Sequence, residues 1–412
     1  MTSELPDFIR ALDNADPLRD YRRKFSLPSD VIYLDGNSLG ALPAATAPRL
    51  EEVVRQEWGM GLIRSWNTHD WIGASRRVGD KIATLIGAQP GEVVVADSTS
   101  VSIFKLLMAA IAARPGRKVI LSEAGNFPTD LYVAQGITAF LPQISVRAVE
   151  PGQMQDAIND DVVAVLLTHV HYKTADKYDM AAITRRAHDC GALMIWDLCH
   201  SAGAVEVDLS AADADLAVGC GYKYLNGGPG APAFLYVAKR LQAELQSPIT
   251  GWLGHAAPFA FTGDYRPAPD IGRFLSGTPP ILGLTALEIG VDMLTEAPRA
   301  QLFEKGQKLC SLFIDLVEQN CAGTGIEIAT MRDPKVRGSH VSLRHAQGYP
   351  IVQALIAEGV IGDFRAPDIL RFGFTPLYLS YADVWRAADI LRDVLATGRW
   401  DDARFKARAQ VT

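Results

Sequence analysis

Short runs of apolar residues alternate with helical stretches between residues 90 and 240. The runs predict buried strands over residues 93–96, 118–122, 162–168, 192–197, 216–219 and 233–237. Apolar residues recur with helical periodicity over 101–113 and 181–190, and residues 123–130 are predicted as a polar loop. Because the strands are apolar throughout rather than at every second position, they favour a mainly parallel sheet covered by helices on both faces. The pattern therefore predicts an α/β fold.

The segments on either side of this region differ from it. Residues 1–30 predict a leading helix and a linker. After residue 281 the predicted helices lengthen, covering 281–295, 299–319, 351–358 and 382–395, with short strands over 326–330 and 340–343. We therefore expect three parts: an N-terminal segment over residues 1–45 that packs with the small domain, a large cofactor-binding domain over 46–285, and a small α+β domain over 286–412.

Composition and charge narrow the class of protein. Hydrophobic residues make up 48% of the 412 and charged residues 21%, a balance that excludes disordered and fibrous classes. The net charge of −7, with no run of Lys or Arg long enough to form a basic stripe, argues against a nucleic-acid partner. No apolar run approaches the ~20 residues of a membrane span, and no apolar signal segment opens the chain. Five cysteines without a C-x-x-C pair fit a reducing compartment, so we expect a cytoplasmic protein without a membrane partner.

Polar residues follow the predicted strands at several points. They lie at 97–100, 126–130, 168–171, 197–200 and 222–223. Ligands of open parallel sheets bind outside the carboxyl ends of the strands. Each of these positions alone has an ordinary structural explanation, but together they predict a binding site at one edge of the sheet.

Asp197 and Lys223 carry the most specific chemistry among these residues. A carboxylate that ends a strand often caps the following turn, but Asp197 could also pair with a cationic ring nitrogen, as in pyridoxal-phosphate sites. Lys223 lies among glycines and apolar residues, where a desolvated amine is available for Schiff-base chemistry. The alternative is a solvent-facing lysine in a glycine-rich turn. The spacing of 26 residues allows consecutive strands to end near each of the two.

Residues 97–100, Asp-Ser-Thr-Ser, come directly before a predicted helix. Helix capping alone would explain them, but free N–H groups and hydroxyls at a helix start also suit a phosphate. No G-x-G-x-x-G or Walker sequence is present, so dinucleotides and nucleoside triphosphates have no motif support.

Two other classes remain open at this point. His169 and His171 could bind a metal with Asp197 and His200, as in a metal-dependent hydrolase. Such histidines are more often hydrogen-bonded residues at strand ends, so we predict no metal. No G-x-S-x-G elbow supports a serine hydrolase. A binding protein without activity is the last alternative, and the Asp197–Lys223 pair argues against it.

A series of motifs along the chain resembles those of one family. The motifs are Leu-Asp-Gly-Asn-Ser-Leu-Gly at 34–40, Phe-Pro-Thr-Asp at 127–130, Asp-x-x-His at 197–200, Gly-Tyr-Lys-Tyr-Leu-Asn-Gly-Gly-Pro-Gly at 221–230, Gly-Trp-Leu-Gly at 251–254, Ser-Gly-Thr-Pro-Pro at 276–280 and Arg-Phe-Gly-Phe at 371–374. Together they resemble the kynureninases, which are fold type I pyridoxal-phosphate enzymes with a class V aminotransferase-like fold. The block at 221–230 is the most specific of them. The resemblance covers nearly the whole chain in family order.

The resemblance implies a site for pyridoxal 5′-phosphate. Lys223 would form the Schiff base, Asp197 would pair with the pyridine nitrogen, and Tyr222 is our candidate proton donor. The other cofactor-binding residues that it implies are Thr99, Ser100, Phe127, Pro128, Thr129, Asp130, Thr168, His200, Trp252 and Thr278. Of these, Thr99, Ser100, Trp252 and Thr278, together with Tyr222, would hold the phosphate or line its pocket. Arg371 would hold the α-carboxylate of the substrate in a bidentate grip. The remaining candidates for the substrate pocket are Ser38, His69 and Trp66.

The implied reaction is hydrolysis of L-kynurenine, and of its 3-hydroxy derivative, to anthranilate (3-hydroxyanthranilate) and L-alanine. The resemblance also implies a homodimer with its sites at the subunit interface, where Thr278 would come from the facing subunit. A cysteine desulfurase or an aminotransferase of the same fold type is the alternative. A desulfurase needs a reactive cysteine on a mobile loop, whereas Cys310 and Cys321 lie in and at the end of a predicted helix. Desulfurases also resemble a pattern with His where Tyr222 stands.

Overall fold

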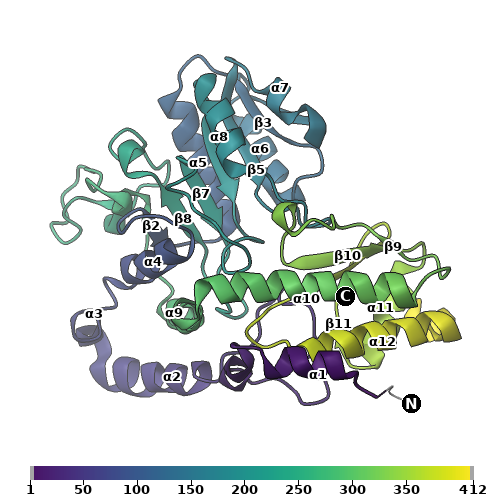
Figure 1. Cartoon of the computed structure of the whole chain (residues 1–412). Helices are drawn as coiled ribbons and strands as arrows, with labels where there is room; N and C mark the ends of the chain where they lie inside the picture. The colour runs from purple at the N-terminus through teal and green to yellow at the C-terminus, as the bar shows by residue number, and fades with distance from the viewer. Residues whose placement is uncertain (1–3, 409–412) are drawn as a thin grey trace. The chain divides into compact units, whose positions relative to one another are not determined.

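The computed structural model describes residues 4–408, and the chain divides into two units (Figure 1). The larger unit comprises residues 46–169 and 178–295, and the smaller unit comprises the N-terminal residues up to 45, residues 170–177 and the chain from 296 onward. The sequence placed a division at 285/286. In the structure, helix α9 (Ile281–Glu296) runs unbroken through that position, and the chain passes to the smaller unit at its carboxyl end. Residues 1–3 and 409–412 of the predicted outer parts lie outside the described residues.

A seven-stranded sheet forms the centre of the larger unit, with the strand order β2-β8-β7-β6-β5-β3-β4. Only β8 runs antiparallel to its neighbours, so the other strands share one direction. This confirms the predicted mainly parallel sheet. The strands are β2 (Val93–Val95), β3 (Val119–Glu123), β4 (Ser145–Val149), β5 (Val162–Thr168), β6 (Leu193–Asp197), β7 (Leu216–Gly219) and β8 (Phe234–Val237).

Helices connect these strands and cover the sheet. Helix α5 packs on β5, β6 and β7 and also touches α6, while α8 packs on β6. Helix α5 connects β2 to β3 and α6 connects β3 to β4, so both connections move toward the β4 edge of the sheet. Helix α8 connects β5 to β6 and so moves in the opposite direction. Because such crossovers are right-handed, α8 lies on the opposite face from α5 and α6. The helices of this unit are α2 (Thr46–Glu52), α3 (Ser65–Thr68), α4 (Ala74–Leu85), α5 (Thr99–Ala113), α6 (Pro128–Phe140), α7 (Met154–Ala157), α8 (Met180–Asp189) and α9.

The sequence analysis did not predict α2, α3, α4, α6, α7 and β4, and two of these omissions have a clear physical reason. Helix α6 begins at Pro128, inside the predicted polar loop over 123–130. Proline is favoured at the first helical position because its missing N–H has no intrahelical partner there. Strand β4 was not predicted, because it lies at the sheet edge, has no fully buried residue and carries Arg147 among its apolar side chains.

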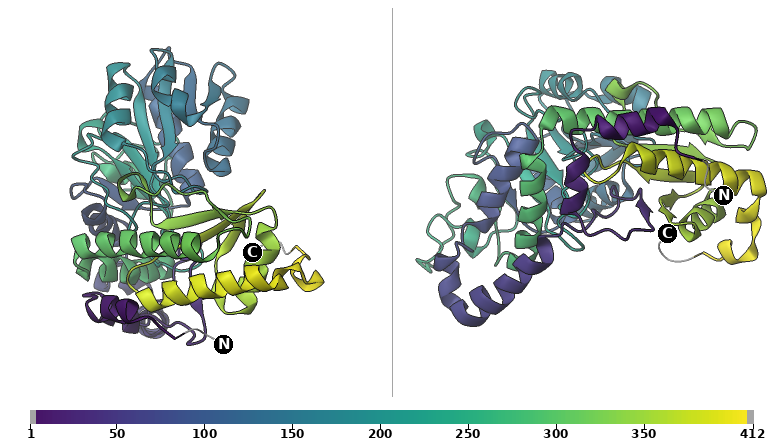
Figure 2. Two further views of the ribbon diagram at one scale, coloured as in Figure 1. Left: turned by 45° about the vertical axis from the view of Figure 1, so that its right-hand side comes forward. Right: turned by 60° about the horizontal axis from the view of Figure 1, so that its bottom comes forward.

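The smaller unit contains a four-stranded antiparallel sheet with the order β12-β13-β10-β9 and the two-stranded pair β1-β11. Its long helices α10 and α12 lie side by side (Figure 2). The bounds are α1 (Asp7–Asn14), α10 (Arg299–Asn320), α11 (Gly348–Ala357), α12 (Tyr381–Thr397), β1 (Ile32–Tyr33), β9 (Glu327–Ile328), β10 (His340–Arg344), β11 (Val360–Ile361), β12 (Asp363–Arg365) and β13 (Ile369–Gly373). The sequence predicted the helices but not β1, β11, β12 and β13. Of the helices within residues 4–408, none is long and apolar enough to cross a bilayer.

Candidate active site

The carboxyl ends of five strands meet at one edge of the large sheet. Strands β2, β3, β5, β6 and β7 point the same way, so the polar segments that follow them share this edge, as predicted. Thr168 ends β5 directly beside Asp197, which ends β6. The loop that carries Lys223 follows β7, the next strand.

Lys223 is buried at this edge, among three side chains that the sequence had assigned to the site. Its Nζ lies 3.4 Å from Nε2 of His200, 5.6 Å from the ring centre of Phe127 and 5.8 Å from that of Tyr222. The loop around it requires glycine: a Cβ on Gly221 would lie 2.4 Å from the carbonyl oxygen of Pro232. The glycine-rich segment therefore serves to hold Lys223 close to the strand end.

Two buried carboxyl groups lie beside this lysine. Asp130 comes from the first turn of α6 and Asp197 from the end of β6, where its Oδ1 accepts a 2.7 Å hydrogen bond from the N–H of Cys199. Burial raises the pKa of Asp130 well above its ordinary value, and the neighbouring charge of Asp197 raises it further. Burial also raises the pKa of Asp197. Among the described residues, Oδ2 of Asp130 has no hydrogen-bond partner.

These features fit pyridoxal phosphate. A protonated pyridine nitrogen would supply the positive charge and the N–H donor that the carboxyl pair lacks. Phe127 offers an aromatic face, and the Nζ of Lys223 is the amine to which the cofactor's aldehyde carbon can be joined.

Asn126 organises this edge, and the sequence analysis did not assign it to the site. Its Oδ1 accepts hydrogen bonds from Oγ1 of Thr168 and from the N–H of Phe127, the latter at 2.8 Å. Its Nδ2 donates to Oγ of Ser122 at 3.0 Å. Asn126 therefore fixes Phe127 relative to β5. The only signal for it was its place in a polar segment after a strand.

The remaining residues predicted to bind the cofactor or its phosphate lie on four segments of the larger unit. Thr99 and Ser100 open α5, whose N-cap Ser98 accepts a hydrogen bond from the N–H of Val101. Trp252 lies in the short helix η6 (Trp252–Gly254), where it packs edge-on against Phe259. Thr278 is exposed in the loop before α9. Pro128 and Thr129 belong to the first turn of α6. No polar contact ties Ser100, Trp252 or Thr278 to Lys223, so their roles stay predictions.

Tyr222 and Cys199 lie at the same site, and the pKa values of both side chains are raised. Burial raises the pKa of Tyr222, and the neighbouring Cys220 and Cys199 add to the shift. Sγ of Cys199 lies 3.8 Å from Oγ1 of Thr99, which joins the start of α5 to the segment that follows β6. Neither cysteine was assigned to the site from the sequence.

In the smaller unit, Arg371 forms a buried cluster of its own. Its Nε and Nη2 donate to the two carboxylate oxygens of Asp363 at 2.9 and 2.5 Å, Nη2 donates to Oγ of Ser38 at 2.8 Å, and Nη1 donates to the carbonyl of Tyr172 at 2.7 Å. Burial alone would raise the pKa of Asp363, but Arg371 and Arg365 more than offset it and hold that pKa below its ordinary value. The bidentate grip predicted for Arg371 stays a prediction, because it requires Arg371 to exchange one of these acceptors for the substrate.

The sequence analysis missed Asp363, Arg365 and Asp35, which surround Ser38 in this cluster. Arg365 Nη2 lies 3.2 Å from Oγ of Ser38 and 2.5 Å from Oδ2 of Asp363. Burial raises the pKa of Asp35 to about 7, and the charge of Asp363 contributes to the shift. At neutral pH the cluster thus holds two guanidinium groups against one fully ionised carboxylate, which favours the binding of an anion.

His69 and Trp66, the remaining predicted pocket residues, lie together near a buried glutamate. Nδ1 of His69 is 3.7 Å from Oε1 of Glu57, and Trp66 packs edge-on against Trp71. Trp71 Nε1 donates to Oε2 of Glu57 at 2.7 Å. The structure therefore brings both residues to one cluster of the larger unit.

The histidines of the metal alternative have other partners. Nδ1 of His169 lies 3.0 Å from Oγ of Ser201, and its ring packs edge-on against Trp196. Nδ1 of His171 accepts a 3.2 Å hydrogen bond from the N–H of Thr174. Across the described part of the chain, no three His, Cys, Asp or Glu side chains are grouped to hold a metal.

Solved structures share the fold of this chain. The apo cysteine desulfurase of Thermococcus onnurineus NA1 has a TM-score of 0.76 and 18% identity, with 96% of this chain and 100% of that chain covered. The cystine C-S lyase C-DES, in complex with its product cysteine persulfide, has a TM-score of 0.77 and 15% identity over 88% of this chain and 98% of its own. At these identities the likeness shows the fold alone.

The curated relatives are much more similar. The model of the kynureninase C-terminal domain matches residues 302–391. Kynureninases from Burkholderia pseudomallei (strain 1106a) and from Pseudomonas fluorescens are each 50% identical to this chain over 408 residues, which cover 98% of both chains in each pair. With that identity over nearly the full length, the chain belongs to the kynureninase family.

Proposed function

We propose that the protein hydrolyses L-kynurenine to anthranilate and L-alanine with pyridoxal phosphate as cofactor, and that it also accepts 3-hydroxykynurenine. The observation that carries the proposal is the buried group at the sheet edge: Lys223 under the ring of Phe127, 3.4 Å from His200, beside the carboxyls of Asp130 and Asp197. Membership of the kynureninase family supports the substrate. The related lyase C-DES was solved with glycine covalently linked to its PLP cofactor.

The chain's own residues would divide the chemistry as follows. Bound pyridoxal phosphate supplies an electron sink for the negative charge that develops at the substrate α-carbon. Asp197 would keep the proton at the ring nitrogen, and Phe127 would cover the ring face. Lys223, once displaced by the substrate amine, would take the α-proton as general base. Water would add its oxygen to the γ-carbonyl carbon, the Cβ–Cγ bond would break, and Cβ would receive a proton, so that the atoms of anthranilate and alanine balance.

Tyr222 is the residue we propose for that last proton. Burial raises the pKa of Tyr222 above its ordinary value, so the hydroxyl keeps its proton at neutral pH and can donate it. In Tyr222→Phe, single-turnover kinetics should show slowed alanine formation, whereas weaker phosphate binding with unchanged chemical steps would contradict the role.

Arg371 would bind the α-carboxylate of the substrate through the guanidinium that now faces Asp363 and Ser38. Arginine suits this task because its planar fork matches a carboxylate, which lysine cannot imitate. Arg371→Lys should therefore raise KM much more than it lowers kcat.

The desulfurase alternative lacks a suitable thiol in the smaller unit. Cys310 is fully buried in α10, and burial raises its pKa to about 12. Cys321 follows the helix, and burial raises its pKa to about 11. Since the thiolate is the nucleophile, neither residue supports attack on the sulfur of a substrate cysteine.

The proposal includes a homodimer in the cytoplasm. Large apolar side chains are exposed on one stretch of the larger unit, and they are Val54, Trp58, Met60, Leu62 and Ile63. Exposed apolar clusters mark interaction surfaces, and a second copy of the chain is the partner we propose. The five free cysteines fit a reducing compartment. A monomeric mass of active wild-type protein in analytical ultracentrifugation would contradict the dimer.

The first experiment joins the absorbance spectrum of purified protein to an activity assay. Bound pyridoxal phosphate should give a visible absorbance band, and added L-kynurenine should yield fluorescent anthranilate. Lys223→Ala should lose both, while the exposed Lys239→Ala serves as the matched lysine control and should keep both. A band without anthranilate would move the proposal to another amino-acid substrate, and wild-type protein without a band would refute the cofactor.

A further inference from the structure

A buried lysine outside the proposed catalytic group joins three segments of the larger unit. Lys105 lies in α5 with no exposed surface. Its Nζ donates to Oδ2 of Asp97 at 2.6 Å, to the carbonyl of Phe274 at 2.7 Å and to Oγ of Ser276 at 3.0 Å. An ammonium has three N–H donors, so this geometry uses all of them.

Two of the three partners of Lys105 lie close in sequence to residues that the resemblance assigns to a cofactor phosphate. Asp97 comes two residues before Thr99, and Ser276 comes two residues before Thr278. The carbonyl of Ser276 also accepts the N–H of Leu253, at 3.2 Å. Leu253 follows Trp252, so the segment around η6 is fastened to the same loop.

Packing against its neighbours does not explain why residue 105 is a lysine. Its helix neighbours Ile103, Leu106 and Leu107 are fully buried apolar residues. A buried charge is costly unless it is paired and hydrogen-bonded. The ammonium here also neutralises Asp97, whose side chain is 30% exposed and whose backbone has a left-handed φ of 55°.

We propose that Lys105 is a positioning residue for the phosphate of the cofactor. Lys105 holds the start of α5 in register with the loop of Thr278 and, through that loop, with the segment of Trp252. It also cancels the charge of Asp97, which would otherwise repel a phosphate. Because Thr278 would reach the phosphate of the facing subunit, Lys105 would position groups of both phosphate sites of the dimer. The inference rests on the proposed function, because it takes these three segments to contribute to the phosphate sites of the dimer.

The test compares pyridoxal phosphate with pyridoxal, which lacks the phosphate, on the apo form of the full-length protein. Binding of each compound is followed by its visible absorbance. Lys105→Met should raise the Kd of pyridoxal phosphate about 10- to 100-fold and leave the Kd of pyridoxal within about threefold. Adding Asp97→Asn to this variant should restore part of the affinity for the phosphate form, because the repulsive charge is gone.

Lys305 offers a matched control in the smaller unit. It is also buried, and its Nζ bonds Asp16 at 2.7 Å and the carbonyl of Pro376 at 2.6 Å. Lys305→Met should lower stability but leave the ratio of the two dissociation constants at the wild-type value. If Lys105→Met does not fold, Ser276→Ala removes one contact without unpairing a charge, and it should change the ratio in the same direction by a smaller factor.

The outcomes separate this inference from the proposed function. An equal loss of affinity for both compounds, or no loss for pyridoxal phosphate, would overturn the role of Lys105 alone. Wild-type protein that binds neither compound would overturn the proposed function, and the role of Lys105 with it.

Discussion

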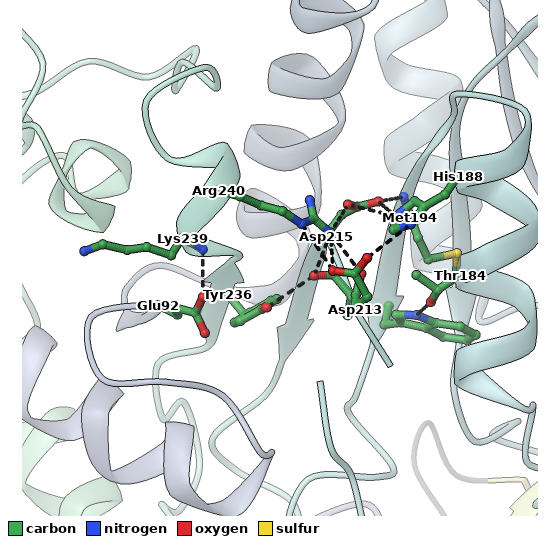
Figure 3. Close-up of polar contacts among 11 residues, drawn as sticks. Glu92, Thr184, His188, Met194, Asp213, Asp215, Tyr236, Lys239 and Arg240 are labelled. Atoms are coloured by element: carbon green, nitrogen blue, oxygen red, sulfur yellow. Dashed lines mark hydrogen bonds and ion pairs between the residues drawn. The ribbon is translucent and has the colours of Figure 1, made fainter. Parts of the chain in front are cut away.

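Buried carboxylates lie at the amino ends of the parallel strands of the large sheet (the amino edge) and at their carboxyl ends (the carboxyl edge). Protein groups pair the carboxylate fully at the amino edge but not at the carboxyl edge. At the amino edge, Asp215 directly precedes β7 and is almost fully buried. It accepts hydrogen bonds from the N–H of Met194 at 2.7 Å and lies 3.0 Å from Nε2 of His188 and 2.7 Å from Nη2 of Arg240 (Figure 3). Burial alone would raise the pKa of Asp215, but His188, Met194 and Arg240 outweigh it and lower that pKa.

At the carboxyl edge, the pairing is incomplete. Asp130 and Asp197 are buried side by side, and burial raises the pKa of both. Lys223 is the nearest cation that opposes these shifts. The carboxyl edge therefore holds an unfavourable arrangement that a cationic ring nitrogen would relieve, as active sites often do.

The comparison teaches that burial alone does not mark a functional carboxylate. Asp215 and Asp197 have nearly the same exposure, 1% and 2%, and both end or begin a strand of one sheet. What differs is whether the protein supplies all the partners. The amino edge is closed by protein groups, whereas the carboxyl edge is built for a group that binds.

Replacing Asp197 should have the largest effect on the reaction. Asp197→Asn keeps the acceptor for the N–H of Cys199 but loses the negative charge, so the ring nitrogen would no longer hold its proton. We expect kcat to fall about 10²- to 10³-fold, measured by anthranilate fluorescence, with no loss of free energy of unfolding in the apo protein. Activity within tenfold of wild type would show that the incompletely paired Asp197 has no important role in the reaction.

The corresponding change at the amino edge should act on stability instead. Asp215→Asn leaves His188 and Arg240 without their buried partner and should lower the free energy of unfolding by about 3 kcal/mol, measured in urea. The kcat of the folded variant should stay within about twofold of wild type. Asp213, whose side chain is 72% exposed, is the control: Asp213→Asn should cost less than about 1 kcal/mol. An Asp215→Asn protein with wild-type stability would contradict the inference that protein groups at this edge fully pair the carboxylate.

The two edges were not equally visible in the sequence. Asp197 and Lys223 could be predicted, because Asp197 ends the predicted apolar strand over 192–197, which matches β6 (Leu193–Asp197) to within one residue. Lys223 follows the predicted apolar strand over 216–219, which coincides with β7. The amino edge showed no pattern, since His188 and Asp215 are 27 residues apart and on different elements.

Long-range partners explain the rest of what was missed. Lys105 and Ser276 are 171 residues apart, and Asp363 meets Arg371 only because β12 and β13 pair in that register. Local periodicity encodes elements but not which elements become neighbours. Strand β4 and the start of α6 were missed for a different reason, because an exposed edge strand and a Pro-led first turn lack an apolar pattern.

Replacing Asp130 tests the incomplete pairing at the carboxyl edge through the stability of the apo protein. Its raised pKa means that folding disfavours its ionised form, so its contribution to stability falls as the pH rises above about 4. Asp130→Asn should therefore stabilise the apo protein at neutral pH by about 1–2 kcal/mol, and the gain should vanish in urea unfolding near pH 4. A variant less stable than wild type at neutral pH would show that Asp130 is fully compensated within the chain.

The smallest expected effect is the pH dependence of the stability that His188 contributes at the amino edge. The hydrogen bond to Asp215 raises the pKa of His188, against burial and the charge of Arg240. A raised folded pKa gives stability that is complete below the unfolded value of about 6.5 and is lost as the pH rises through the folded value. His188→Gln does not titrate, so its stability relative to wild type should improve by up to about 1 kcal/mol between about pH 6 and pH 9. Because its lowered pKa keeps Asp215 ionised over this range, a difference that is constant or moves the other way would place the titration elsewhere.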